Sequence, residues 1–195
     1  SAELEARLAP VYQQLRIPKG QLAALTGIEA RRWWPEGHRV SEGATAAARK
    51  ALQQTGIEAA ELGALIYAGV CREQYEPATA CRVAALLGTT TDCVTYDISN
   101  ACLGALSGMV DIANRIELGQ IKAGMVVTCE SARHIVETTL AKLLNKADML
   151  SYVRSLATFT GGSGAIAIIL SDGDLQAAKA PVAQLLGVTS TAASQ

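Results

Sequence analysis

One residue of this chain, Cys102, is of a type that could carry out thioester chemistry, and the residues around it indicate how. Cys102 lies between an apolar stretch at 94–98 and a run of small residues at 103–108, a pattern typical of a strand, a tight turn and a helix. At a helix start, unpaired backbone N–H groups and the helix dipole stabilise both a thiolate and an oxyanion. The pattern therefore predicts a cysteine nucleophile for acyl transfer, with a helix beginning at or just after it.

The residue pattern leaves a second interpretation open for Cys102 and indicates a structural role for Glu76. Free cysteine is among the most buried residue types, so Cys102 could simply pack between a strand and a helix. Its small neighbours, Ala101 and Gly104, favour the nucleophile because they allow a sharp turn and the approach of a thioester. Glu76 precedes Pro77, where a helix is predicted to begin, and a carboxylate there is favourable to the helix dipole whether or not it is catalytic.

Composition argues against several classes of partner and cofactor. The chain has 17 basic and 18 acidic residues, which gives no basic patch for a nucleic acid. No apolar run approaches the roughly 18–20 residues of a membrane span. The five cysteines are odd in number, irregularly spaced and without a CxxC pair, and there are only two histidines, so we expect neither a metal site nor a disulfide framework. A reducing cytoplasm is the expected compartment.

Alternating strands and helices indicate the fold class. Short apolar stretches predict strands at 64–69, 94–98, 125–129, 165–170 and 182–191. Helical patterns occur at 41–55, 77–88, 102–118 and 136–156, after an opening segment to about residue 25 that predicts one long and one short helix. Ser41 is the predicted N-cap of the helix that Gly56 ends. The alternation predicts a single α/β domain, residues 1–195, with a mainly parallel sheet covered by helices on both faces.

Three further features permit more than one interpretation. The glycine-rich residues 161–164 precede a predicted strand and lack a following Lys-Ser/Thr, so a tight turn is favoured over a phosphate-binding loop. The arginines and tryptophans of 31–34 could bind a coenzyme A nucleotide or could form a surface loop anchored by the tryptophans. His134 follows the end of a predicted strand and is interpreted as structural.

Residues 97–109, DISNACLGALSGM, resemble the active-site segment of ketosynthase III enzymes, which have a thiolase fold. Other matching segments follow the family's order, namely TGIEARRWW, SEGATAAARKAL, GALIYAGVCREQYEPATACRVAALLG, GMVVTCESAR and FTGGSGAIAIIL. The resemblance implies the N-terminal half of a thiolase-like fold, incomplete without a C-terminal half that supplies a catalytic histidine and asparagine. That half would come from the same chain or from a companion chain.

Within this family, residues 72–80, REQYEPATA, resemble the branch that joins two fatty acyl thioesters head to head on the route to olefins. The resemblance implies an acyltransferase that performs a non-decarboxylative Claisen condensation of two fatty acyl-CoA molecules through an acyl-Cys102 intermediate. It also implies a homodimer, in which Glu76 of one copy removes the α proton of the second acyl chain in the other copy's site. The resemblance implies no cofactor beyond the acyl-CoA substrate.

Two rival functions remain at this point. The first is a decarboxylating 3-oxoacyl-[acyl-carrier-protein] synthase III, which generates its carbanion from a malonyl group and needs no base at the position of Glu76. Its substrates would include acyl-carrier-protein thioesters. The second is a non-catalytic ketosynthase-like half that acts as a scaffold, although such halves commonly lose the cysteine that is present here at 102.

Overall fold

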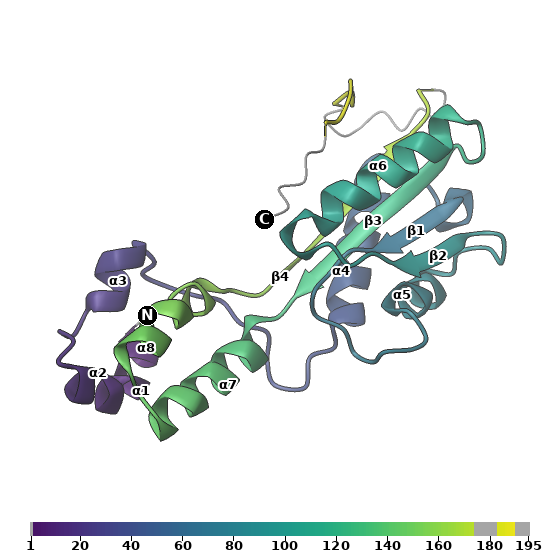
Figure 1. The fold of residues 1–195 in the computed structure, drawn as a ribbon. Helices are drawn as coiled ribbons and strands as arrows, with labels where there is room; N and C mark the ends of the chain where they lie inside the picture. Colours follow the sequence, from purple (N-terminus) through teal and green to yellow (C-terminus); the bar gives the residue numbers. More distant parts are fainter. Residues whose placement is uncertain (1, 174–182, 190–195) are drawn as a thin grey trace. The chain divides into compact units, whose positions relative to one another are not determined.

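The computed structural model describes residues 2–173 and 183–189, which fall into two compact units (Figure 1). The helical unit combines Ser1–His38 with Glu130–Gly164, and the α/β unit combines Arg39–Cys129 with Ala165–Gln195. Among the helices of the described ranges, none is long and apolar enough to cross a membrane.

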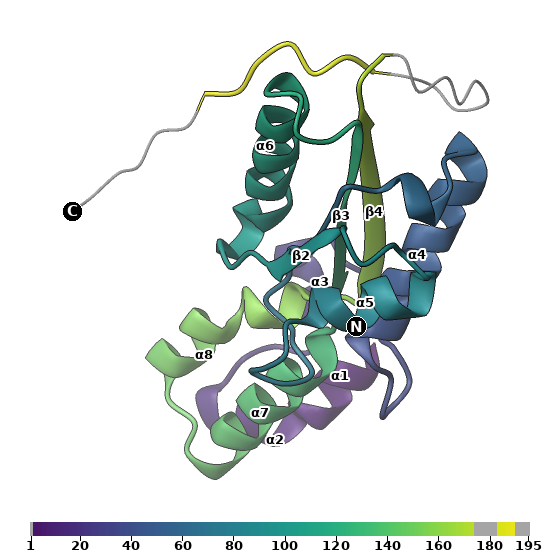
Figure 2. The same cartoon turned by 90° about the vertical axis from the view of Figure 1, so that its right-hand side faces the viewer.

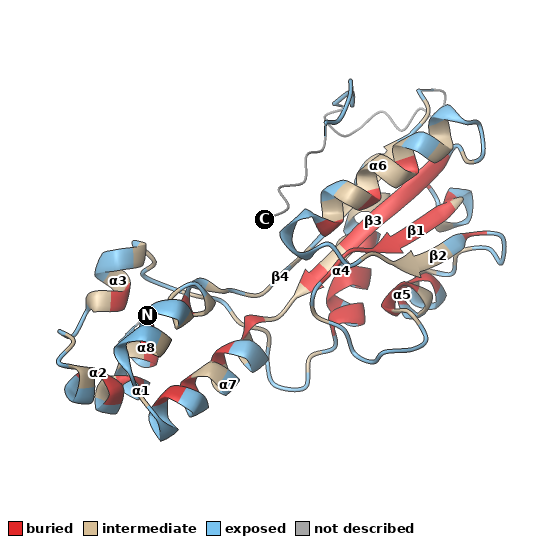
Figure 3. Cartoon of the chain, in the orientation of Figure 1, coloured by how far each residue is buried: buried red, intermediate tan, exposed pale blue. Residues whose placement is uncertain are grey.

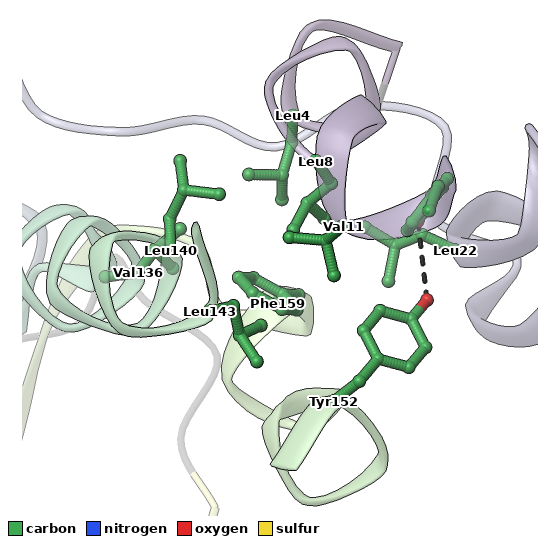
Figure 4. Packing of buried hydrophobic residues seen from close by; sticks show 11 residues of the cluster. Leu4, Leu8, Val11, Leu22, Val136, Leu140, Leu143, Tyr152 and Phe159 are labelled. Atoms are coloured by element: carbon green, nitrogen blue, oxygen red, sulfur yellow. Dashed lines mark hydrogen bonds between the residues drawn. The ribbon is translucent and has the colours of Figure 1, made fainter. Parts of the chain in front are cut away.

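The helical unit is built around one apolar cluster. Its elements are α1 (Ala2–Arg7), α2 (Ala9–Leu15), α3 (Gln21–Thr26), α7 (Ala132–Asn145), α8 (Met149–Ser155) and the 3₁₀ turn η3 (Thr158–Thr160). Figure 4 shows Phe159 between leucines and valines of α1, α2 and α7, and Tyr152 of α8 meeting a side chain of α2. The Tyr12 and Tyr152 rings pack edge to face with centroids 5.8 Å apart. Aromatic pairs of this geometry are more favourable than their buried area alone implies.

Two predicted helices of this unit are each divided in two. The opening helix breaks at Leu8, the N-cap of α2, and Pro10 lies in the first turn of α2, where its missing N–H breaks no helical bond. The predicted helix at 136–156 begins earlier, at Ala132, and is interrupted between Asn145 and Met149. Asp148 caps the second part, because its carboxylate accepts the Ser151 N–H at 2.9 Å.

The α/β unit contains a four-stranded sheet in the order β2-β1-β3-β4. The strands are β1 (Ala64–Tyr67), β2 (Val94–Asp97), β3 (Ala123–Glu130) and β4 (Gly164–Ser171). Central β1 pairs in parallel with both β2 and β3. A bond of 2.9 Å from the Asp172 N–H to the Lys122 carbonyl joins the end of β4 to the start of β3, so that pair is antiparallel. The sheet is mixed and mainly parallel, as predicted.

Helices cover both faces of this sheet. They are α4 (Val40–Thr55), α5 (Thr79–Leu87) and α6 (Gly104–Glu117), with the 3₁₀ turns η1 (Ala59–Glu61) and η2 (Ala101–Leu103). Figure 2 shows α6 on one face and α4 with α5 on the other. Figure 3 shows that β1 and most of β3 are buried between these layers. A strand buried on both faces explains the unbroken apolar run of β1.

Close packing and a polar network fix α6 on the sheet. A Cβ added at Gly108 of α6 would lie 3.1 Å from both Val126 methyl groups. Any residue larger than glycine at this position would therefore require the helix or Val126 of β3 to move. Asp111 of α6 accepts hydrogen bonds from the Tyr96 hydroxyl of β2 and from Arg115 Nε, the latter at 2.9 Å. Burial opposes ionisation of Asp111, but these two bonds outweigh it and hold the pKa of its carboxyl below the usual value.

Three details of the predicted elements are wrong. The N-cap of α4 is Arg39 and not Ser41, whose N–H and hydroxyl instead donate to the Glu73 carboxylate. Helix α5 begins at Thr79, two residues after Pro77. Of the strand predicted at 182–191, residues 183–189 are irregular, and residues 182, 190 and 191 lie outside the described ranges.

The two faces of the short helix α3 should differ sharply in their contribution to stability. Leu22 is 0% exposed within the cluster, whereas Leu25 is 57% exposed. We expect Leu22→Ala to lower the free energy of unfolding by about 2–5 kcal/mol and Leu25→Ala by less than about 0.5 kcal/mol. Urea unfolding of the two variants measures this difference, and equal losses would contradict the packing described for α3.

Candidate active site

Both predicted site residues lie in loops at the same edge of the sheet. Cys102 follows β2 and Glu76 lies between β1 and α5. Because β1 and β2 are parallel, both loops leave from the carboxyl ends of their strands. They lead to helices on opposite faces, α5 and α6. Such a divergence between neighbouring strands is where open α/β sheets bind their ligands.

The turn at Cys102 has the geometry expected for an accessible nucleophile. Cys102 is exposed and lies within η2, immediately before α6. The first bond of this turn runs from the Leu103 N–H to the Asn100 carbonyl at 2.9 Å, so the Cys102 N–H precedes the hydrogen-bonded part of the turn. That N–H is a candidate donor to an oxyanion. The exposed side chain contradicts the alternative of a cysteine packed between strand and helix.

The sharp bend depends on Ala101 and not on Gly104. Ala101 has a φ of 43°, in the left-handed region that residues other than glycine rarely adopt. Gly104 has a helical φ of −54°, and a Cβ there would make an ordinary contact with Ala68 at 3.6 Å. Asn100 supports the bend, because its Nδ2 donates to the Ser107 hydroxyl at 2.8 Å. Backbone strain of this kind is concentrated at functional sites in proteins.

Glu76 is exposed in the loop between β1 and α5 and does not cap that helix. The carboxylate at the start of α5 belongs to Asp97, the last residue of β2. Its two oxygens accept the Thr79 and Ala80 N–H groups, each at 2.9 Å. The interpretation of Glu76 as a helix-start carboxylate is therefore wrong. Within the described part of the chain, Glu76 and Cys102 make no hydrogen bond with each other.

Three further contacts fasten the loop that carries Glu76. The buried Tyr67 hydroxyl lies 2.7 Å from the Cys71 carbonyl and 2.8 Å from the Cys129 carbonyl. Glu73 accepts the Ser41 N–H at 2.8 Å, and Arg72 Nε lies 4.0 Å from the Asp97 carboxylate. Asp97, Glu73 and Tyr67 were not among the site residues predicted from the sequence. For Asp97, the one signal in the sequence was the lack of a capping side chain where the helix after Pro77 was predicted to begin.

The tryptophans near residue 33 anchor a loop of the helical unit. The indole N–H of Trp33 donates to the Gly161 carbonyl at 3.2 Å, and that of Trp34 donates to the Glu130 carbonyl at 3.1 Å. The glycine-rich residues before β4 form the turn into that strand, where the Ser163 N–H donates to the Arg32 carbonyl at 2.7 Å. These contacts favour the structural interpretation of both segments.

The described residues contain neither a metal-binding cluster nor a disulfide. His134 is exposed on α7. Over residues 2–173 and 183–189, no group of three or more His, Cys, Asp or Glu side chains could hold a metal ion. All five cysteines are free thiols.

Comparison with protein families identifies the fold. The thiolase N-terminal domain matches residues 24–153, a range that includes both Glu76 and Cys102. The chain belongs to the thiolase family. Within this thiolase-like fold, the mixed sheet with helices on both faces agrees with the prediction.

Three individual proteins show which kinds of enzyme the chain is similar to. An acyl-CoA:acyl-CoA alkyltransferase of Shewanella oneidensis is 63% identical over 195 residues, which are 100% of this chain and 56% of that protein. OleA of Xanthomonas campestris, crystallised with lauric acid and lauroyl-CoA, superposes with a TM-score of 0.82 at 37% identity, over 89% of this chain and 52% of that one. A beta-ketoacyl-[acyl-carrier-protein] synthase III of Rhodospirillum rubrum is 36% identical over 58% of this chain and 35% of that enzyme.

The lengths of these matches show how much of each relative the chain covers. It spans about half the length of the first two relatives. Its fold corresponds to the N-terminal half of a thiolase-like enzyme of the acyltransferase type, with both the alkyltransferase and the ketosynthase III branches among its relatives.

The contact between Gly69 and Tyr67 gives a test of how firmly the loop is held. A Cβ at Gly69 would lie 2.7 Å from the Tyr67 ring, which is buried and held by its hydroxyl. We expect Gly69→Ala to lower the free energy of unfolding by about 1–3 kcal/mol, because the ring must move. In the matched variant, Gly164→Ala, the new methyl group meets no atom within 4 Å, and we expect little change. Urea unfolding compares the two, and a fully stable Gly69→Ala variant would refute the tight contact.

Proposed function

We propose that this chain is the cysteine-bearing half of an enzyme that joins two fatty acyl-CoA molecules by a non-decarboxylative Claisen condensation. One observation carries the proposal. Cys102, which follows the strained Ala101 in the chain, is exposed at the same edge of the sheet as the exposed Glu76. The 63% identity to an acyl-CoA:acyl-CoA alkyltransferase supports this choice of substrates.

In the first step of the proposed reaction, the Cys102 thiolate attacks the carbonyl carbon of one acyl-CoA. The tetrahedral oxyanion receives a hydrogen bond from the Cys102 N–H, and the carbon–sulfur bond to coenzyme A breaks. The products are an acyl-Cys102 thioester and the coenzyme A thiolate, which takes up a proton. In this half of the proposed enzyme, the Cys102 side chain is exposed, which agrees with attack by its sulfur on a substrate.

In the second step, Glu76 removes the α proton of another acyl-CoA. The resulting enolate carbon attacks the acyl-Cys102 carbonyl, a carbon–carbon bond forms, and the Cys102 thiolate is released. The product is a 2-alkyl-3-oxoacyl-CoA, and one coenzyme A is released for every two substrates consumed. A general base is required because an unactivated thioester loses no carbon dioxide that would generate the carbanion.

The proposed active enzyme contains more than this chain. We expect a homodimer in which Glu76 of one copy serves the Cys102 site of the other. We also expect a C-terminal half, from the same or a companion chain, that supplies a histidine and an asparagine. Acyl-CoA is the only coenzyme-bearing component expected.

The second candidate function is a decarboxylating 3-oxoacyl-[acyl-carrier-protein] synthase III. Relatives of that description favour it, including the Rhodospirillum rubrum enzyme at 36% identity. It shares the acyl-Cys102 step but takes its carbanion from a malonyl thioester, so the exposed Glu76 would have no catalytic role. A scaffold without catalysis is the third possibility, in which Cys102 would never be acylated.

Acylation of Cys102 is the first expected outcome. Incubation of the complete protein with a long-chain acyl-CoA should add one acyl mass in intact mass spectrometry, because Cys102 is the proposed nucleophile. The adduct should be absent from Cys102→Ala and unchanged in the matched variant Cys81→Ala, whose thiol is half-buried. An adduct that persists in Cys102→Ala, or that never forms in the wild type, would exclude the proposed nucleophile.

Loss of the base should block only the second step. We expect Glu76→Gln to form the acyl-Cys102 adduct normally but to condense two acyl-CoA molecules at least about 100-fold more slowly, the usual contribution of a general base. The matched variant is Glu42→Gln, another exposed glutamate of the same unit. Chromatography of the 3-oxoacyl product measures the rates. Undiminished condensation by Glu76→Gln, with malonyl thioesters as the better second substrate, would favour the ketosynthase III function instead.

A further inference from the structure

The carboxylate of Asp97 connects the two loops of the candidate active site. Its side chain is only 7% exposed. Its Oδ2 accepts the Thr79 N–H and its Oδ1 accepts the Ala80 N–H, each at 2.9 Å. Hydrogen bonds from backbone N–H groups to an ionised carboxylate at a helix start are charge-assisted, and the helix dipole adds to them. Asp97 therefore serves as the cap of α5, whose own N-cap residue, Ala78, has no side chain that could do so.

Asp97 also lies close to the other end of the loop. Arg72 Nε is 4.0 Å from Asp97 Oδ2, and Arg72 precedes Glu76 whereas Thr79 and Ala80 follow it. One buried carboxylate thus contacts the chain on both sides of Glu76. The same residue ends β2 and begins the turn that leads to Cys102.

Glu73 makes a second attachment of the same kind. Its Oε1 accepts the Ser41 N–H at the start of α4, at 2.8 Å, and its Oε2 lies 3.7 Å from Arg82 Nε of α5. Helix α4 also has an N-cap residue, Arg39, that makes no capping bond with its own side chain. Between the two attachments, the side chains of Tyr75, 95% exposed, and Glu76 point into solvent.

We propose that Asp97 and Glu73 are positioning residues, which cap α5 and α4 with their carboxylates and thereby hold the intervening loop so that Glu76 projects in one fixed orientation. This inference rests on the proposed role of Glu76 as a base. A base at an unactivated α carbon needs accurate placement, and an error of about 1 Å can cost about 100-fold in rate. The turn that carries Cys102 has bonds of its own, from the Leu103 N–H to the Asn100 carbonyl and from Asn100 Nδ2 to the Ser107 hydroxyl, so we expect the two steps of the reaction to respond differently.

The test is to substitute each carboxylate in the complete protein and to measure both steps separately. Asp97→Asn keeps the size of the side chain, but it removes the negative charge and replaces one of the two accepting oxygens with an NH2 group, which cannot accept an N–H. Glu73→Ala removes the bond to Ser41 and decides the question on its own if Asp97→Asn does not fold. Asp92→Asn, at an exposed carboxylate shortly before the same strand, is the matched control. For each variant, intact mass gives the rate of Cys102 acylation, chromatography gives the rate of condensation, and amide hydrogen exchange reports on residues 72–80.

We expect condensation to fall by about 100-fold in Asp97→Asn and Glu73→Ala, with wild-type acylation of Cys102 and faster exchange at the amides that each carboxylate holds. The control should resemble the wild type in all three measurements. Condensation at the wild-type rate, or acylation and condensation falling together, would overturn the inference. Failure of the proposed function would look different, because the wild type would not condense acyl-CoA or Glu76→Gln would remain fully active.

Discussion

The parallel pairing of β1 with β2 is the constraint on which the candidate site depends. In this register Tyr67 is opposite Asp97, so the last residues of the two strands are neighbours. A shift by one residue would exchange the side chains on the two faces of β1, where Leu65 and Ile66 are both fully buried, so the packed layers on both faces would have to repack. The loops that follow must then start from adjacent points, with Glu76 in one and Cys102 in the other.

Carboxylates near the same edge of the sheet also cap two helices, α4 and α5. Every helix begins with backbone N–H groups that have no partner within the helix, and burying them without a partner is costly. Helices α4 and α5 start with residues that provide no side-chain cap, and carboxylates from elsewhere in the chain, Glu73 and Asp97, take their place. Stability and placement of the loop therefore depend on the same contacts, since removing either carboxylate would expose a helix end and release the loop together.

Features that depend on neighbouring residues could be predicted from the sequence, whereas contacts between residues far apart in the sequence could not. Strands β1 and β3 were predictable because burial on both faces produces continuous apolar runs, and the turn at Cys102 was predictable from its small neighbours. The cap of α5 was not, because its acceptor, Asp97, lies 18 residues from Thr79. The residues around Ser41 predicted that its side chain caps a helix. In the structure, the Ser41 N–H instead donates to the carboxylate of Glu73, 32 positions away. Such pairs form only after the sheet has brought distant segments together.

The turn at Cys102 combines a fixed backbone with an exposed side chain. The left-handed conformation of Ala101 costs about 1–2 kcal/mol and persists only where surrounding contacts enforce it. Here the contacts are the Asn100–Ser107 bond and the close packing of α6 against β3 at Gly108. The proposed reaction, which joins two acyl chains, needs open space around the sulfur but no freedom in the backbone that carries it. The exposed Cys102, on a turn held by these contacts, fits both requirements, and in the proposed arrangement the carboxylates of Asp97 and Glu73 hold the loop of Glu76 in a comparable way.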